Sequence, residues 1–296
     1  MKYPVIHRRH DALERRNADL FSGALEHAQS LTRRQMLKGS LAGVAALVLG
    51  PVAGMLLPRE AMADEAVKTG KFVFPRLQFS VSDETGDIWN TGLVGDANLR
   101  QKLRELTNIN ASDEAKVVRL GDLDDLCRNP FVFMTSEGHF KLPDQEERNL
   151  REFLERGGFI HVDDCVYPSA KGKDIPSDIV GNVIKPRPAG DPGDIDRFFR
   201  DYALMINRLF PDNPMRKVPY DHEIFHVYFD FKEGSPHMQG VRHGMWGLFE
   251  PGTGRIMTVA TPGDLHCGWM NQYWAKEKNM EAIKMGINII IYFLSH

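Results

Sequence analysis

The chain has 296 residues, of which 42% are hydrophobic and 26% are charged, with a formal net charge of −3 and three cysteines. This ordinary globular composition excludes collagen, low-complexity disorder and a disulfide-dense mini-protein. The near-neutral balance gives no reason to expect nucleic acid as a partner. Because three cysteines cannot all pair within one chain, at least one thiol is free or bridged elsewhere.

The first 63 residues differ from the rest in charge, with a net of +4 against −7 for the remainder. Within them, an apolar run without charged residues spans 39–57 and follows the consecutive Arg33 and Arg34. This order resembles a twin-arginine export signal. The resemblance implies that the twin-arginine export machinery is a partner and that the protein folds before it is exported.

The end of this leader predicts a cleavage site. Ala61 and Ala63 stand three residues and one residue before the predicted cut, where signal peptidase needs small side chains. We expect cleavage between Ala63 and Asp64, which leaves 64–296 as a single periplasmic or exported domain. The alternative is an uncleaved anchor in the inner membrane, because the apolar run is just long enough to span a bilayer.

The patterning of the mature chain predicts alternating strands and helices. Strands are expected over 72–81, 116–120, 131–135, 159–162, 224–231, 245–249 and 256–260, and helices over 99–106, 143–156, 195–210 and 280–294. The central strands are continuously apolar, which is typical of strands buried on both faces of a parallel sheet. We therefore predict a three-layer α/β domain with a mostly parallel sheet. Residues 167–194, rich in proline and glycine, form a long inserted loop that is either a lid or disordered.

Acids and histidines gather near the predicted strand ends, where parallel sheets bind ligands. The candidates for ligand or metal binding are Glu137, His139, His161, Asp163, Asp164, His222, Asp264 and His266. His222 precedes its predicted strand, so it joins the others only if that strand is antiparallel. Carboxylates with neutral imidazoles bind divalent metals such as zinc, manganese or iron. The chain has no H-E-x-x-H or C-x-x-C motif, so a divalent metal is an open alternative rather than a motif-based assignment.

Each candidate also has a structural interpretation. Aspartates that follow a strand often cap helices, and a histidine in an apolar strand is often a hydrogen-bonded core residue. Cys165 ends a strand, as a nucleophile would, but an elbow needs small neighbours and these are Asp164 and Val166. Whether Cys165 pairs with Cys267 stays open.

Several motifs carry a resemblance to a known family. They are L-R-E-F-L-E-R-G-G-F-I-H-V-D-D-C at 150–165, P-Y-D-H-E-I-F at 219–225 and P-G-D-L at 262–265. With them, 74–296 resembles the bacterial domain-of-unknown-function family numbered forty-one fifty-nine. The resemblance implies a flavodoxin-like fold of the class I glutamine-amidotransferase type. Those amidotransferases use a Cys-His-Glu triad that this chain does not show legibly.

Two functions follow from these observations. The first is a non-catalytic exported domain that holds a small ligand or a periplasmic protein partner at the strand-end edge, through residues such as Asp163, Asp164, His222 and Asp264. The second is a metal-dependent hydrolase that uses the same residues as ligands and general base. Aspartates that cap helices would weaken the second.

Overall fold

In the computed structural model, the structure describes residues 71–81, 88–165, 179, 182–188, 191 and 193–296. The predicted leader with its cleavage site, and most of the predicted 167–194 loop, lie outside the described residues. Among the helices that are described, none combines the length and the apolar character needed to cross a bilayer.

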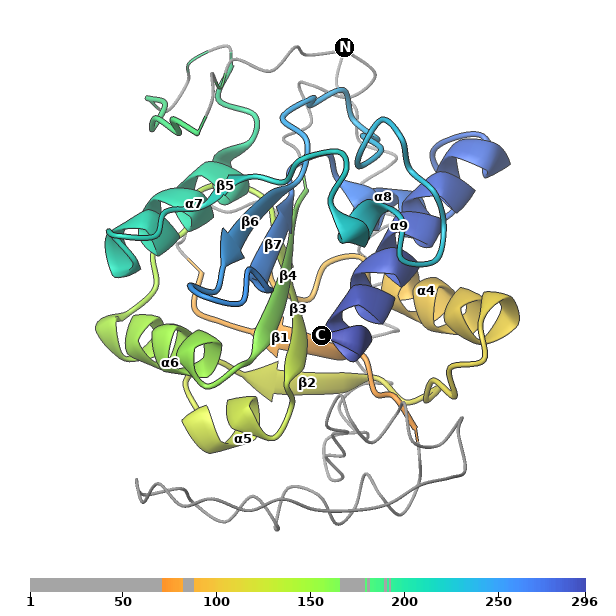
Figure 1. The fold of residues 1–296 in the computed structure, drawn as a ribbon, viewed down its shortest axis with the longest axis horizontal. Helices are drawn as coiled ribbons and strands as arrows, with labels where there is room; N and C mark the ends of the chain where they lie inside the picture. Colours follow the sequence, from red (N-terminus) through yellow and green to blue (C-terminus); the bar gives the residue numbers. More distant parts are fainter. Residues whose placement is uncertain (1–70, 82–87, 166–178, 180–181, 189–190, 192) are drawn as a thin grey trace, which may run out of the picture.

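A seven-stranded sheet with the order β2-β1-β3-β4-β7-β6-β5 forms the middle of the domain (Figure 1). Its strands are β1 (Pro75–Gln78), β2 (Lys116–Arg119), β3 (Phe131–Ser136), β4 (Phe159–Asp164), β5 (Arg216–Lys217), β6 (Trp246–Phe249) and β7 (Ile256–Thr261). The first four strands and β7 pair in parallel, whereas β6 pairs antiparallel with both β7 and β5.

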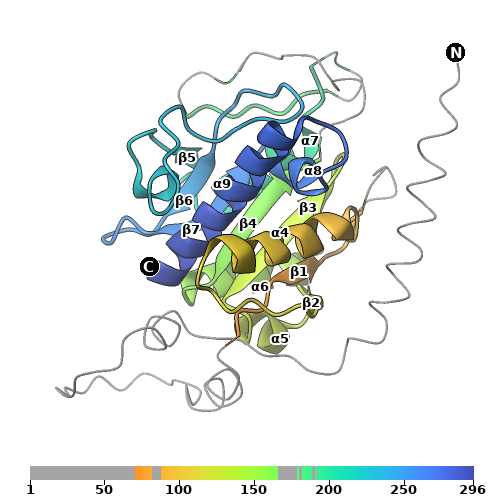
Figure 2. The same ribbon diagram turned by 90° about the vertical axis from the view of Figure 1, so that its right-hand side faces the viewer.

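Helices cover both faces of this sheet (Figure 2). One face carries α4 (Leu93–Leu106), α8 (Leu265–Trp269) and α9 (Lys276–Ser295), and the other carries α5 (Leu123–Cys127), α6 (Asp144–Glu155) and α7 (Arg197–Leu209). Successive side chains of a strand point to opposite faces. Phe133 and Phe159 thus enter the core under α9, and Met134 and Ile160 enter the core under α6 and α7. The predicted three-layer α/β fold with a mostly parallel sheet is confirmed.

The predicted strand over 224–231 is wrong. The chain forms one turn of 3-10 helix, η2 (Glu223–Phe225), followed by turns. The backbone of this segment is hydrogen-bonded to a side chain of α9 and not to a neighbouring strand. Asn288 of α9 donates to the carbonyls of Ile224 (3.1 Å) and Phe229 (2.8 Å) and accepts from the Phe229 amide (2.9 Å). Because these groups are satisfied on α9, the segment needs no strand partner.

The longer elements match their predictions more closely than the short ones. Helix α6 begins after Pro143, carries acids in its first turn and ends before Gly157, which has a φ of 91°. Helix α4 begins at Leu93, earlier than the predicted residue 99. The sequence did not predict α5, α8 or β5, since two to five residues are too few to show a period.

Candidate functional site

Asp163, the next-to-last residue of β4, lies buried on the α8 face of the sheet. One carboxylate oxygen accepts hydrogen bonds from the Thr261 hydroxyl (2.5 Å) and the Leu265 amide (3.0 Å). The other accepts from the His266 amide (3.0 Å). Because a helix begins with amides that lack partners, Asp163 caps the first turn of α8. Both of its oxygens are occupied by the fold.

Asp164, the next residue, points to the opposite face. Its Oδ2 accepts from the Phe199 amide (2.9 Å) in the first turn of α7. Its Oδ1 accepts no hydrogen bond from any residue that the structure describes. Burial, reinforced by the nearby Asp196 carboxylate, raises the pKa of Asp164 well above its usual value. The two neighbouring aspartates therefore hold two helices on two faces of the sheet.

Asp264 begins α8 with a left-handed backbone (φ 60°). Its carboxylate accepts from the Cys267 amide (3.2 Å) and from the side-chain amide of Gln239. Burial raises the pKa of Asp264 and that of Asp163, and the Asp264 charge raises the pKa of Asp163 further. The two carboxyls thus share one low-dielectric corner, where ionising both at once is unfavourable.

His266 joins a buried ion pair. Arg76 of β1 donates to both oxygens of Asp96 in α4, at 2.6 and 3.0 Å. His266 Nε2 lies 3.1 Å from Arg76 Nη2 and 3.3 Å from Asp96 Oδ1. Burial alone would raise the pKa of Asp96, but the Arg76 charge and the His266 contacts lower it to about 2. His266 therefore links α8 to β1 and α4.

His161 packs among aromatic rings in the middle of the sheet. Its ring centroid lies 5.0 Å from that of Phe133 and 5.7 Å from that of Trp269, and its Nε2 lies 2.9 Å from the Thr261 hydroxyl. Burial, together with the charge of neighbouring His266, lowers the pKa of His161 to about 3. The imidazole is therefore neutral at physiological pH and acts as a core residue.

Glu137 and His139 follow β3, and His139 contacts α7. Glu137 is buried, and His139 Nδ1 lies 2.9 Å from an Asp201 oxygen while its Nε2 lies 3.3 Å from an Asp194 oxygen. Burial lowers the pKa of His139, but the hydrogen bond and the charge of Asp201 outweigh it, so the pKa is raised. His139 is thus an ion-pair partner of the α7 region, separated by the sheet from His266.

His222 lies where β6 ends and β7 begins, away from the carboxyl end of β4. Its ring centroid is 5.7 Å from that of Phe249, which pairs with Ile256 at the start of β7, and 5.5 Å from that of Tyr292. Burial lowers its pKa. His222 lines a surface pocket with Glu223 and Arg255, and it does not join the strand-end residues.

Cys165 and Cys267 meet at the carboxyl end of β4. Their sulfurs lie 3.9 Å apart, and both side chains are buried. Asp264 completes a group whose ligand atoms all lie within 4.8 Å of one another. Among the predicted candidates, the structure thus brings Asp163, Asp264 and His266 together with Cys165. His139 and Asp164 lie on the α7 side, Glu137 is buried directly after β3, and His222 lies elsewhere.

Three contributors to this edge of the sheet were missed by sequence reasoning. Arg76, Asp96 and Gln239 come from segments far apart in the chain. Arg76 could have been noticed, because it stands inside an apolar strand and a charge that is buried there needs a partner. No local pattern distinguishes Asp96 or Gln239 from solvent-facing polar residues.

Comparison with known proteins gives a family but no function. None of the curated proteins compared with the chain matches it. The family model described as domain of unknown function (DUF4159) matches residues 73–294, which is most of the chain. The protein therefore belongs to the DUF4159 family, as the motifs at 150–165 and 219–225 indicated.

Proposed function

We propose that this protein is an exported binding or assembly domain rather than an enzyme. The observation that carries the proposal is the use of the two strand-end aspartates. Asp163 accepts three hydrogen bonds, two of them from α8 amides, and Asp164 accepts one from an α7 amide. A general base or an open catalytic metal needs carboxylate oxygens that face substrate or solvent. Here both Asp163 oxygens and one Asp164 oxygen accept hydrogen bonds from the fold, and both side chains are buried.

A surface suited to a partner lies on the long segment between β5 and β6. It exposes Tyr220 and Tyr228, which are 48% and 49% accessible. Tyrosine is enriched at protein interfaces because it buries a large area at a small entropic cost. Asn288 ties the segment to α9, and the Tyr228 hydroxyl donates to the Leu106 carbonyl at 2.6 Å. These bonds give Tyr228 and the neighbouring backbone a defined position before any partner binds.

The order of the five parallel strands, β2-β1-β3-β4-β7, supports the flavodoxin-like class implied by the family resemblance. The metal-dependent hydrolase built on Asp163, Asp164 and His222 is supported less well. Its proposed residues lie on two faces and two edges of the sheet.

Export is supported by the leader sequence. We expect that replacing Arg33 and Arg34 with lysines holds the protein in the cytoplasm, since the resemblance rests on this pair. Cell fractionation of the native host, with an N-terminal sequence of the mature protein, measures both export and the cut before Asp64. Export of the Lys-Lys variant at the parental level would contradict the twin-arginine route.

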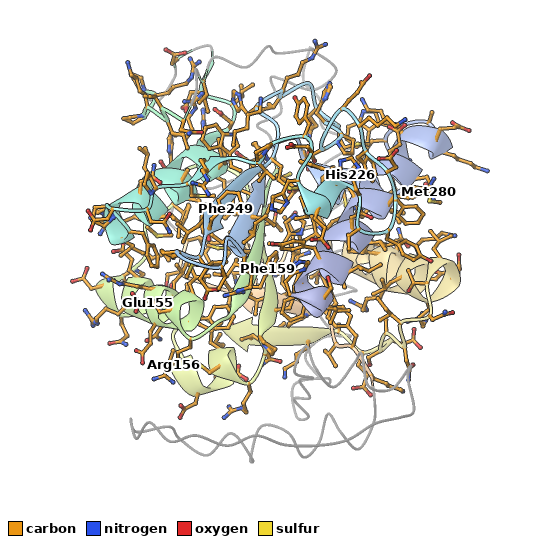
Figure 3. The ribbon with its side chains drawn as sticks, in the orientation of Figure 1. Glu155, Arg156, Phe159, His226, Phe249 and Met280 are labelled. Atoms are coloured by element: carbon orange, nitrogen blue, oxygen red, sulfur yellow. The ribbon has the colours of Figure 1, made fainter. Side chains whose placement is uncertain are left out.

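The partner surface is tested by site-specific photo-crosslinking in the native host. We expect a photoreactive phenylalanine at position 220 or 228 to give one covalent adduct of defined mass. The same residue at Glu155 serves as the control, because α6 lies across the sheet from the segment that carries His226 (Figure 3). A set of adducts that is the same from all three positions, or no adduct from 220 and 228, would contradict the proposed surface.

A further inference from the structure

We propose that Cys165, Cys267 and Asp264 bind one thiophilic divalent metal ion, with zinc as the reference, in a closed site at the carboxyl end of β4. The site is independent of the partner surface proposed above. It uses two sulfurs and one carboxylate oxygen, and zinc binds each of these ligand types in proteins.

The spacing of the sulfurs matches metal coordination. With metal–sulfur bonds of about 2.3 Å, two thiolates at tetrahedral angles lie about 3.8 Å apart. The Cys165 and Cys267 sulfurs lie 3.9 Å apart, and all three ligand atoms lie within 4.8 Å of one another. A disulfide needs about 2.0 Å between the sulfurs, so its formation would require them to approach much closer.

The fold sets these positions from the end of β4 and the start of α8. Cys165 directly follows β4, and its amide donates to the Ser136 carbonyl at 3.1 Å. Cys267 and Asp264 belong to the first turn of α8, whose amides are held by Asp163. The aspartate that caps α8 therefore places both remaining ligands against the end of β4.

Gln239 orients two of the three ligands. Its side-chain nitrogen contacts the Asp264 carboxylate and lies 3.7 Å from the Cys267 sulfur, and the residue is fully buried. Its side-chain oxygen has no hydrogen-bond partner among the described residues. In this orientation Gln239 holds the Asp264 carboxylate and the Cys267 sulfur in place beside the metal position.

The surroundings are those of a closed site. Met270 packs against the two cysteines, with Val94 and Trp274 beside them. An apolar shell limits access of water and favours a metal that is retained over one that exchanges with substrate. Binding converts two thiols to thiolates, so the two cysteine protons pass to buffer as the metal–sulfur bonds form, without any change in oxidation state.

The test uses the full chain, purified with reductant, and cobalt(II) as an optical probe. We expect one equivalent of cobalt to give a thiolate-to-cobalt charge-transfer band that zinc removes by displacement. The variants Cys165→Ser and Cys267→Ser should each lose this band, and Asp264→Asn should bind more weakly. Cys127→Ser is the matched control, because Cys127 lies at the end of α5 on the other face of the sheet, and it should keep the band.

A second measurement on the unsubstituted protein covers variants that fail to fold. Because Cys165 and Cys267 are buried, the rate of their alkylation reports opening of this corner. We expect zinc to slow this rate while Cys127 reacts as before, as read by peptide mass spectrometry over time. The proposal is overturned if the two serine variants keep the band while folded. It is overturned equally if the reduced protein gives no stoichiometric band, or if zinc leaves the alkylation of all three cysteines unchanged.

Discussion

The side-chain oxygens of Asp163 and Asp164 bind backbone amides on opposite faces of the sheet, although the two residues are consecutive. Asp163 accepts from the Leu265 and His266 amides, and Asp164 accepts from the Phe199 amide. This division follows from the alternation of side chains along β4. A pair of acids at a strand end, which suggests a metal or a proton relay, thus joins two helical layers to one strand.

Asp163→Asn is expected to destabilise the protein more than Asp164→Asn. Both oxygens of Asp163 accept from donors, so an amide nitrogen would face an N–H group and cost about 2–4 kcal/mol. The second oxygen of Asp164 accepts from none of the described residues, so an amide fits there at about 1 kcal/mol or less. Urea unfolding of both variants measures the difference, and equal losses would contradict the capping assignment.

Asp96→Asn is expected to lower the free energy of unfolding by about 3–5 kcal/mol, because it leaves the buried Arg76 charge uncompensated. Replacing both residues with apolar ones, as in Arg76→Met with Asp96→Leu, should recover part of that loss. The folded pKa of Asp96, about 2, lies below its ordinary 3.8. Its stabilisation is therefore complete above about pH 4 and is lost as the pH falls toward 2.

His161→Gln is expected to make the free energy of unfolding depend less steeply on pH between pH 6.5 and 3. The folded pKa of His161, about 3, lies below its ordinary 6.5, so burial of the neutral ring stabilises the fold fully above pH 6.5. This contribution, on the order of 5 kcal/mol, disappears as the pH falls from 6.5 to 3. Unfolding free energies at several pH values measure the slope. His226→Gln, at a histidine whose side chain is 35% accessible, is the control and should leave that slope in place.

Asn288→Ala is expected to release the 219–231 segment from α9. Three hydrogen bonds are lost together, which corresponds to about 2–3 kcal/mol. Limited proteolysis should then cut within this segment before the rest of the chain. Asn279→Ala is the control on the same helix, since Asn279 holds Asn271 and Trp274 instead. Equal cutting of the segment in both variants would contradict the role of Asn288.

The sequence predicted the layers well because the long elements carry their own signals. The runs at 131–135 and 159–162 are continuously apolar, and the helix over 143–156 has a proline, acids and glycines at the proper ends. The segment at 224–231 alternates like a strand, but its apolar residues pack on α9. Alternation shows which side chains are buried and not what buries them.

The site was predictable only in part, because strand order is a non-local property. That Asp163 and Asp264 meet depends on β4 lying beside β7, which no local pattern specifies. The same neighbourhood brings Cys165 to Cys267. His222 was placed in this group through a strand that the chain does not form.

The bond from the Leu265 amide to Asp163 joins residues 102 positions apart, and it has a consequence for the order of events during synthesis. The corner that holds both cysteines cannot assemble until the last helices have left the ribosome. A chain that crossed the membrane as it emerged would deliver two separate thiols to an oxidising compartment, where thiols are converted to disulfides. Transport after folding would deliver them already buried beside Asp264, so under the export proposed above the timing of transport would decide the chemical state in which this corner arrives.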